Sequence, residues 1–369
     1  MKSLKLLKSI GISLLIVIGI LFIAVVGYVV YMNLQYYRID DNTKIAVENP
    51  SKKILKTGQE HSLVTYNIGF GAYNHDFSFF MDSGEMKDGT LVTGKNSKAK
   101  DKQTVINNTK GALSSVDSLD SDFYMFQEVD MKATRSHKVN QYAQLKTLGA
   151  NYSLSFANNF HSAFLLYPLL DPHGAVDGGI TTMSKYNISE SIRKQYPVDP
   201  SFITKFTDLD RCFLVSRIPV DNGKELVLIN SHMSAYDKGG KIREKQLAVL
   251  NSTLKQEYAK GNYVIVGGDF NHDIAHTKTV FETNQKVPEW VYEMNDENLA
   301  DGFSFAIANN AAKIPTCRST DMPYVKGQNY TVVIDGFIVS DNVSAVANNI
   351  DTDFMYSDHN PVMLKFKLS

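Results

Sequence analysis

A run of 23 residues without a charged side chain, Ile10 to Met32, constrains this sequence more than any other feature. As an α-helix it would extend about 34 Å, which exceeds the roughly 30 Å hydrocarbon core of a bilayer. A cleaved signal peptide is the alternative, but its apolar region is usually shorter and ends at small residues, whereas this run continues through Val29, Val30 and Tyr31. The length therefore favours an uncleaved membrane anchor over residues 1–33.

The charges that flank this run predict its orientation. Lys2, Lys5 and Lys8 precede it, whereas basic and acidic residues are mixed in the segment 38–44 that follows. Because basic residues are enriched on the cytoplasmic side of membrane helices, we expect a single-pass protein of the cell membrane with a cytoplasmic N-terminus and an extracellular domain.

Composition excludes several classes of protein. Hydrophobic residues make up 43% of the 369 residues and only two are cysteines, so the chain is neither a disordered protein nor a disulfide scaffold. Without the three N-terminal lysines, 35 basic residues stand against 39 acidic ones. No general basic surface therefore indicates a tight nucleic-acid binder, although a nuclease needs only a local basic groove. Cys212 and Cys317 fit either a disulfide or two buried thiols.

After a polar segment, 34–60, predicted as a linker, short apolar runs recur to the end of the chain. They are rich in β-branched residues and bounded by turn residues, which predicts strands. The runs are Leu63–Tyr66, Phe123–Phe126, Ile180–Met183, Phe213–Val215, Leu226–Ile229, Tyr263–Val266, Val332–Val339 and Val362–Phe366. Helical spacing of apolar residues predicts helices over Thr104–Leu119 and Gly240–Ala259. We expect one α/β domain over 61–369, with two packed sheets and helices outside.

The segment from Gly71 to Lys102 is long for a loop in a compact domain. It is rich in Gly and Lys, and Phe77, Phe79 and Phe80 cluster near its start. We expect either a substrate-facing insertion or a surface loop held by a small aromatic cluster.

Polar residues interrupt or follow the predicted strands in six short motifs. These are LVTYNIGFG with Asn67, FYMFQEVD with Glu128, LVLINSHMSAY with His232, VIVGGDFNHD with Asp269 and Asn271, VVIDGFIVS with Asp335, and YSDHNPV with Asp358 and His359. Hydrolysis of a phosphate ester needs a hard cation, a positioned water and a group that protonates or stabilises the leaving oxygen. These residue types could bind the cation, position the water and act on the leaving oxygen.

Each motif also has a structural interpretation. Glu128 is either an oxygen ligand for Mg²⁺ or a solvated loop acid like Asp130. Asp269 and Asn271 point to the same side if the chain is extended, yet they also suit a turn in which their side chains cap backbone groups. Asp335 lies inside an apolar run, where a carboxylate needs a histidine or a metal as its partner.

Taken together and in this order, the motifs resemble the endonuclease/exonuclease/phosphatase superfamily over residues 61–369, with GDFN and SDHNPV as the specific part. The resemblance implies a DNase I-like four-layer sandwich of two mixed β-sheets flanked by helices. It also implies a Mg²⁺-dependent phosphoesterase, with Mn²⁺ as the alternative ion. The metal site would involve Glu128, Asn67 and Asp358, and the catalytic residues would be His232, Asp269, Asn271, Asp335 and His359. Arg211 and Arg135 are candidates for a phosphate-binding rim, because a guanidinium matches phosphate oxygens.

We therefore expect hydrolysis of a phosphate ester, favouring a phosphodiester, on the outer side of a bilayer that the N-terminal helix binds. The substrate is a lipid headgroup, a nucleic acid or a small molecule. An extracellular nuclease is one alternative, and a surface binding or regulatory module without catalysis is another, because a fold does not fix a function. The long Gly71 to Lys102 segment and the stretch PTCRSTDMPY depart from compact members of the superfamily and leave the substrate undetermined.

Overall fold

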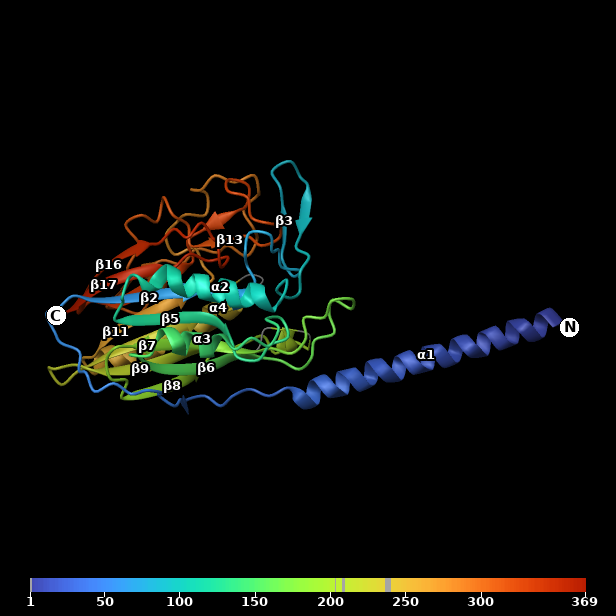
Figure 1. Ribbon diagram of the computed structural model, residues 1–369, viewed down its shortest axis with the longest axis horizontal. Coiled ribbons are helices and arrows are strands. Elements are labelled where there is room, and N and C mark those ends of the chain that lie inside the picture. The colour runs from blue at the N-terminus through green and yellow to red at the C-terminus, as the bar shows by residue number, and fades with distance from the viewer. Residues whose placement is uncertain (1, 203, 208–209, 236–239) are drawn as a thin grey trace.

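The computed structural model describes residues 2–369 except 203, 208–209 and 236–239. Two mixed β-sheets pack together, helices cover their outer faces, and one long helix projects from the domain (Figure 1). The six-stranded sheet has the order β16-β17-β2-β5-β7-β6, with β2 (His61–Asn67), β5 (Phe123–Asp130), β6 (Ser153–His161), β7 (Asp177–Ser184), β16 (Val343–Asn349) and β17 (Val362–Leu368). The seven-stranded sheet has the order β1-β8-β9-β10-β11-β15-β12, with β1 (Thr43–Lys44), β8 (Glu190–Gln195), β9 (Cys212–Pro219), β10 (Glu225–His232), β11 (Tyr263–Asp269), β12 (Phe303–Phe305) and β15 (Asp335–Ser340).

The remaining elements cover or extend these sheets. Two hairpins consist of β3 (Ser83–Glu85) with β4 (Leu91–Thr93), and β13 (Cys317–Arg318) with β14 (Thr331–Val332). The helices are α1 (Lys2–Gln35), α2 (Lys102–Asp117), α3 (Gln141–Leu148) and α4 (Lys241–Ala259). The helices α2 and α3 pack on the six-stranded sheet, and α4 packs on the seven-stranded one. This two-sheet, helix-flanked architecture is the one expected from the sequence.

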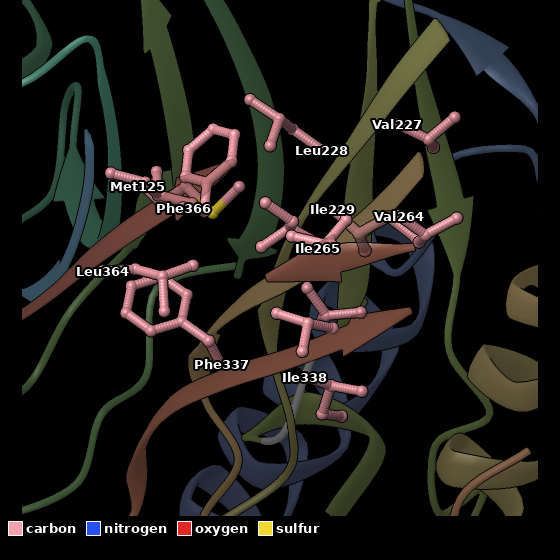
Figure 2. Close-up of a cluster of buried hydrophobic side chains, with 14 of the residues drawn as sticks. Met125, Val227, Leu228, Ile229, Val264, Ile265, Phe337, Ile338, Leu364 and Phe366 are labelled. Carbon is pink, nitrogen blue, oxygen red and sulfur yellow. The ribbon is translucent and has the colours of Figure 1, made fainter. Parts of the chain in front are cut away.

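The main hydrophobic core fills the space between the sheets. Met125, Leu364 and Phe366 of the six-stranded sheet belong to the same buried cluster as Leu228 and Phe337 of the seven-stranded sheet (Figure 2). Burial of each such side chain stabilises the fold by about 1.5–3 kcal/mol. The core therefore fixes the distance between the sheets and hence the positions of the residues at their ends.

Every predicted strand and helix is confirmed, except that the run Val332–Val339 divides between β14 and β15. Among the longer strands, sequence patterning misses β6, β8 and β16; SLSFANNFH and ESIRKQ are largely polar. Within β8 the side chain of Arg193 is buried and donates to the carbonyl oxygens of Asn158 (2.9 Å) and Asp210 (2.7 Å). Cys212 and Cys317 are free, buried thiols, which answers the question that the sequence left open.

The segment between Gly71 and Lys102 contains both order and an aromatic cluster. It forms the β3–β4 hairpin, and its Phe77 and Phe79 pack against Phe70 and Tyr73 in a small separate core. The expected aromatic cluster is therefore present.

The N-terminal helix α1 extends away from the domain (Figure 1). Within the part of the chain that the structure describes, its residues 6–35 form the one helix that is long and apolar enough to cross a membrane. A membrane anchor and a signal sequence both fit that description. The segment predicted as a linker lies along the domain: Arg38 pairs with Asp210 at 3.0 Å, β1 pairs with β8, and Leu55 is fully buried.

A network of ion pairs joins β9 to α4. Arg217 donates to both carboxylate oxygens of Glu257, at 3.0 and 2.7 Å, and Lys260 and Asn262 donate to the same carboxylate. Burial would raise the pKa of Glu257, but these hydrogen bonds outweigh burial and lower its pKa to about 2. The ionised carboxylate therefore stabilises the folded state.

We predict that Glu257→Gln lowers the free energy of unfolding by about 3 kcal/mol at pH 7. Because the folded-state pKa is the lower one, this difference is fully present above the ordinary value of 4.5 and disappears as the pH falls toward 2. Urea unfolding of the full chain in detergent, at pH 7 and pH 3, measures both values. The exposed Glu244→Gln on the same helix should change stability by less than about 0.5 kcal/mol. An equal loss at both pH values would contradict this interpretation.

Candidate active site

Strand register brings three of the predicted residues side by side on the seven-stranded sheet. His232 at the end of β10 pairs with Asp269 at the end of β11, and Asp269 pairs with Asp335 at the start of β15. Because β10 and β11 are parallel, their last residues lie at one edge of the sheet. The Nε2 of His232 is 3.6 Å from Oδ2 of Asp269.

The six-stranded sheet contributes Asn67 and Glu128 at the same end of the domain. Asn67 ends β2 opposite Gln127 of the parallel strand β5, and the next residue, Glu128, lies in a β-bulge with a φ of 55°. Positive φ at a non-glycine residue costs on the order of 1 kcal/mol or more, so the surrounding structure must hold it. The Nδ2 of Asn67 lies 3.4 Å from Oε1 of Glu128 and 3.1 Å from Oδ2 of Asp269. Asn67 therefore bridges the two sheets.

His359 and Asp335 form a buried hydrogen-bonded pair. The Nδ1 of His359 is 2.8 Å from Oδ2 of Asp335, and its Nε2 is 3.7 Å from Oδ2 of Asp269. Burial would lower the pKa of His359, but the charge of Asp335 and of the neighbouring acids outweighs burial and holds this pKa well above its ordinary value. The imidazole is thus charged and oriented by Asp335.

Asp269, Asp335 and His359 lie close enough together to hold a metal ion. Nδ1 of His359 is already bonded to Asp335, so only its Nε2 faces Asp269. In the absence of a metal, these three residues therefore form a close group of two carboxyls and one imidazole.

His232 and Asp269 are buried and have shifted pKa values for different reasons. Burial lowers the pKa of His232 well below its ordinary value, and the positive charge of Arg211 lowers it further. Burial raises the pKa of Asp269 to about 7, and the nearby charge of Asp335 adds to this. The site thus contains one charged and one neutral histidine around a carboxyl that titrates near neutrality, which is typical of acid and base catalysis.

The residues expected to bind metal offer oxygen atoms that suit a divalent cation. The Glu128 side chain is 24% exposed, and its carboxylate lies 3.9 Å from Nη1 of Arg135, which is a long ion pair. Burial raises the pKa of Asp358 to about 6; the charge of His359 opposes this shift and that of Glu128 adds to it. Acids that repel one another at a partly exposed site fit Mg²⁺, which takes one or two protein carboxylates and keeps several waters.

The side-chain amide of Asn67 faces two acids, Glu128 and Asp269. Its Oδ1 accepts a hydrogen bond from the backbone N–H of Gly69 (3.0 Å), so its amide donor faces Glu128 and Asp269. Ser357 donates from Oγ to the Asn67 carbonyl at 2.8 Å, and the same Oγ lies 3.3 Å from Oδ1 of Asp358. Ser357 thereby connects the end of β2 to the loop that carries Asp358.

Asn271 forms the turn that the sequence left as one of two interpretations. Its backbone N–H donates to Oδ1 of Asp269 (2.8 Å), and its side chain Nδ2 donates to the carbonyl of Met233 (2.9 Å). Gly268 precedes this turn with a φ of 151°, and a Cβ there would lie 1.9 Å from the carbonyl oxygen of Ser231. Only glycine therefore allows β11 to approach β10 so closely before the turn.

The two arginine candidates differ in their surroundings. Arg211 is partly exposed, and its charge acts on His232. Arg135 is buried and binds both carboxylate oxygens of Asp130, at 3.1 and 2.9 Å. Asp130 itself is fully buried, so the expectation of a solvated loop acid is wrong for this residue. Polar and apolar residues alternate around Asp130, so the sequence does not reveal that its side chain is buried and paired with Arg135.

Sequence reasoning misses a buried polar bridge just behind the site. Gln127 of β5 donates from Nε2 to Oδ1 of Asn230 in β10 (2.8 Å), and Asn230 donates to the carbonyls of Phe126 (3.3 Å) and Thr181 (2.9 Å). The bridge joins the two sheets one residue before Glu128. Polar residues within otherwise apolar strands, in FQEVD and LINSH, are the signal that marks it.

The comparisons with known proteins agree with this fold. The model of the Endonuclease/Exonuclease/phosphatase family matches residues 64–359, so the chain belongs to this family. An endonuclease/exonuclease/phosphatase from Beutenbergia cavernae is similar in fold (16% identity, TM-score 0.55, covering 84% of this chain and 72% of that one). So are TDP2 from C. elegans (15%, 0.53, 87% and 77%) and a family protein from Leptotrichia buccalis (15%, 0.52, 84% and 100%). Comparison with curated proteins gives no significant match.

We predict that Asp335→Asn lowers the pKa of His359 by about 1 pH unit or more in metal-free protein, because the charge that favours the imidazolium is removed. Titration of the histidine ring signals by NMR, on labelled full-length protein in detergent micelles, measures this change. Asp341→Asn, an exposed residue just after β15, is the control and should leave the titration of His359 unaltered. An unchanged pKa in Asp335→Asn would show that the pair is not formed in solution.

Proposed function

We propose that this chain is a metal-dependent phosphoesterase that cleaves phosphodiesters on the outer side of a membrane, to which α1 anchors it. The observation that carries the proposal is the meeting of six motifs from both sheets around Asp269. Oδ2 of this residue lies 3.1 Å from Asn67, 3.6 Å from His232 and 3.7 Å from His359. A module without catalysis has no need to bury and orient this set of groups.

In this proposal Glu128 and Asp358 hold the cation, and Asn67 positions both the metal-site acid and Asp269. A divalent cation bound there supplies positive charge to the phosphate oxygens. Asp269 orients the attacking water and accepts its proton, a role that suits a carboxyl with a pKa of about 7.

The two histidines act on the phosphate and on the leaving oxygen. His359, charged and held by Asp335, stabilises the negative charge that develops on phosphate. The neutral His232 lies on the other side of Asp269, next to Arg211, and donates a hydrogen bond to the leaving oxygen. The backbone N–H of Asn271 fixes the Asp269 carboxylate, and the side-chain amide of Asn271 completes the phosphate contacts.

We predict that Asp269→Asn lowers kcat on bis-p-nitrophenyl phosphate by at least about 100-fold, because the general base is lost. The assay uses the full chain in detergent with Mg²⁺, and EDTA should abolish the wild-type rate. The exposed Asp301→Asn removes a carboxylate away from the site and should retain wild-type kcat. An active Asp269→Asn enzyme would remove the proposed role, and nicking of plasmid DNA at a comparable rate would identify a nuclease.

We predict that Glu128→Gln weakens Mn²⁺ binding by at least about tenfold, since a charged oxygen ligand becomes neutral. Isothermal titration calorimetry of the full chain measures the dissociation constant directly and does not depend on turnover. Glu297→Gln, which neutralises an exposed acid, is the matched control. Equal affinities in the wild type and Glu128→Gln would place the metal elsewhere.

A further inference from the structure

The loop between β6 and β7 exposes an unusual set of large apolar side chains. Its residues 162–170, SAFLLYPLL, contain no charge. The exposed fractions are 38% for Phe164, 42% for Leu166, 70% for Tyr167, 80% for Leu169 and 101% for Leu170. Contiguous exposed apolar side chains of this size mark a surface that contacts a protein or a membrane.

This loop is bonded to the outer end of the N-terminal helix. The hydroxyl of Tyr28 donates to the carbonyl of Phe164 (3.1 Å) and accepts from the N–H of Leu166 (3.1 Å). The hydroxyl of Tyr31 accepts from the N–H of Phe164 (3.2 Å). Figure 1 shows the loop projecting from the domain on the side toward which α1 extends. The loop and α1 therefore meet any membrane together.

The contacts with α1 place the loop at the depth of a bilayer surface. Tyr28 and Tyr31 lie within the uncharged run that ends at Met32, and Tyr28 is about 6 Å along the helix from Met32. Backbone N–H and C=O groups that enter lipid need hydrogen-bond partners within the protein. The tyrosine hydroxyls provide partners for three such groups, at Phe164 and Leu166, and so lower the cost of bringing this part of the loop to the membrane.

The loop also reaches the active-site end of the domain. Since β7 is antiparallel to β5, the start of β7 lies beside the end of β5, where Glu128 is located. Phe160, just before the loop, lies under the guanidinium of Arg135 at 5.0 Å, and this guanidinium is the one 3.9 Å from Glu128. On the return side, Asp171 pairs with Lys98 at 2.5 Å, so the polar part of the loop is held by the domain.

We propose that residues 164–170 insert into the outer leaflet of the bilayer that α1 spans and hold the active-site end of the domain against the lipid headgroups. This inference rests on the proposed phosphodiesterase function and defines its substrate as a phosphodiester presented by the membrane surface. The occupant is lipid rather than protein, because the loop lies beside a helix whose most apolar stretch has no buried residue in the described structure.

The first test places a fluorophore at the loop tip. Leu170→Cys is labelled with an environment-sensitive dye in the full chain, whose two natural cysteines are buried, and is reconstituted into phosphatidylcholine vesicles. We expect a blue-shifted emission that spin-labelled acyl chains quench. Ile54→Cys is the control. Its neighbour Leu55 bonds to Pro219, the last residue of β9, at the end of that strand away from the β6–β7 loop. The dye at position 54 should therefore remain in water. A water-exposed dye at position 170, or shielding only at high protein density, would overturn the proposal.

The second test separates substrate presentation from chemistry. Leu169→Ser combined with Leu170→Ser should lower hydrolysis of a lipid p-nitrophenyl phosphodiester in vesicles by at least about tenfold, since two apolar side chains that would enter the lipid are lost. Hydrolysis of soluble bis-p-nitrophenyl phosphate should be unchanged. Ile54→Ser combined with Val346→Ser, two exposed apolar residues elsewhere, should affect neither substrate. Equal rates on vesicles would overturn the proposal, whereas no hydrolysis of either substrate by the wild type would refute the proposed function and leave the dye measurement to decide insertion.

Discussion

The hydrogen bond from Asn67 to Asp269 is the contact on which the site depends, because it joins the ends of two different sheets. Neither sheet alone contains a complete set of groups: the six-stranded sheet carries Asn67 and Glu128, and the seven-stranded sheet carries His232 and Asp269. A shift of either sheet by one residue along its strands, roughly 3.3 Å, would break this contact. The apolar core between the sheets and the polar bridge from Gln127 to Asn230 prevent that shift.

The electrostatics of the site follow from burying several ionisable groups close together. A buried carboxylate without partners is strongly destabilising, so each acid here has a specific arrangement. Asp335 is neutralised by His359, and Asp130 by Arg135. Glu128 and Asp358 lack a partner of that quality among the described residues, and a bound cation would relieve their mutual repulsion. This difference between the neutralised and the unneutralised acids is the physical basis on which we propose proton transfer for one group and metal binding for the other.

Much of this site can be predicted from the sequence because its residues follow strands that are apolar enough to recognise. LVTYN, VIVGGD and LVLINSH each end in a residue of the candidate site, so finding the strand also finds the side chain. The bulge that turns Glu128 toward Asn67 has no such signal, since it depends on how β5 pairs with β7. Arg135 illustrates the same limit: the sequence alone does not distinguish an arginine that is available to phosphate from one that a buried aspartate already binds. The uncharged loop 162–170 likewise looks like an ordinary apolar segment until its exposure and its contacts with α1 are known.

The chain after α1 restricts how the domain can stand relative to the helix. A flexible linker of this length would let the active site face any direction. Instead, Arg38 binds Asp210, and β1 adds to the edge of the seven-stranded sheet beside β8. Tyr28 and Tyr31, which precede Met32 in the chain, bond to the β6–β7 loop. With contacts both before and after Met32, the direction of α1 and the direction in which the candidate site faces are set by the same few residues.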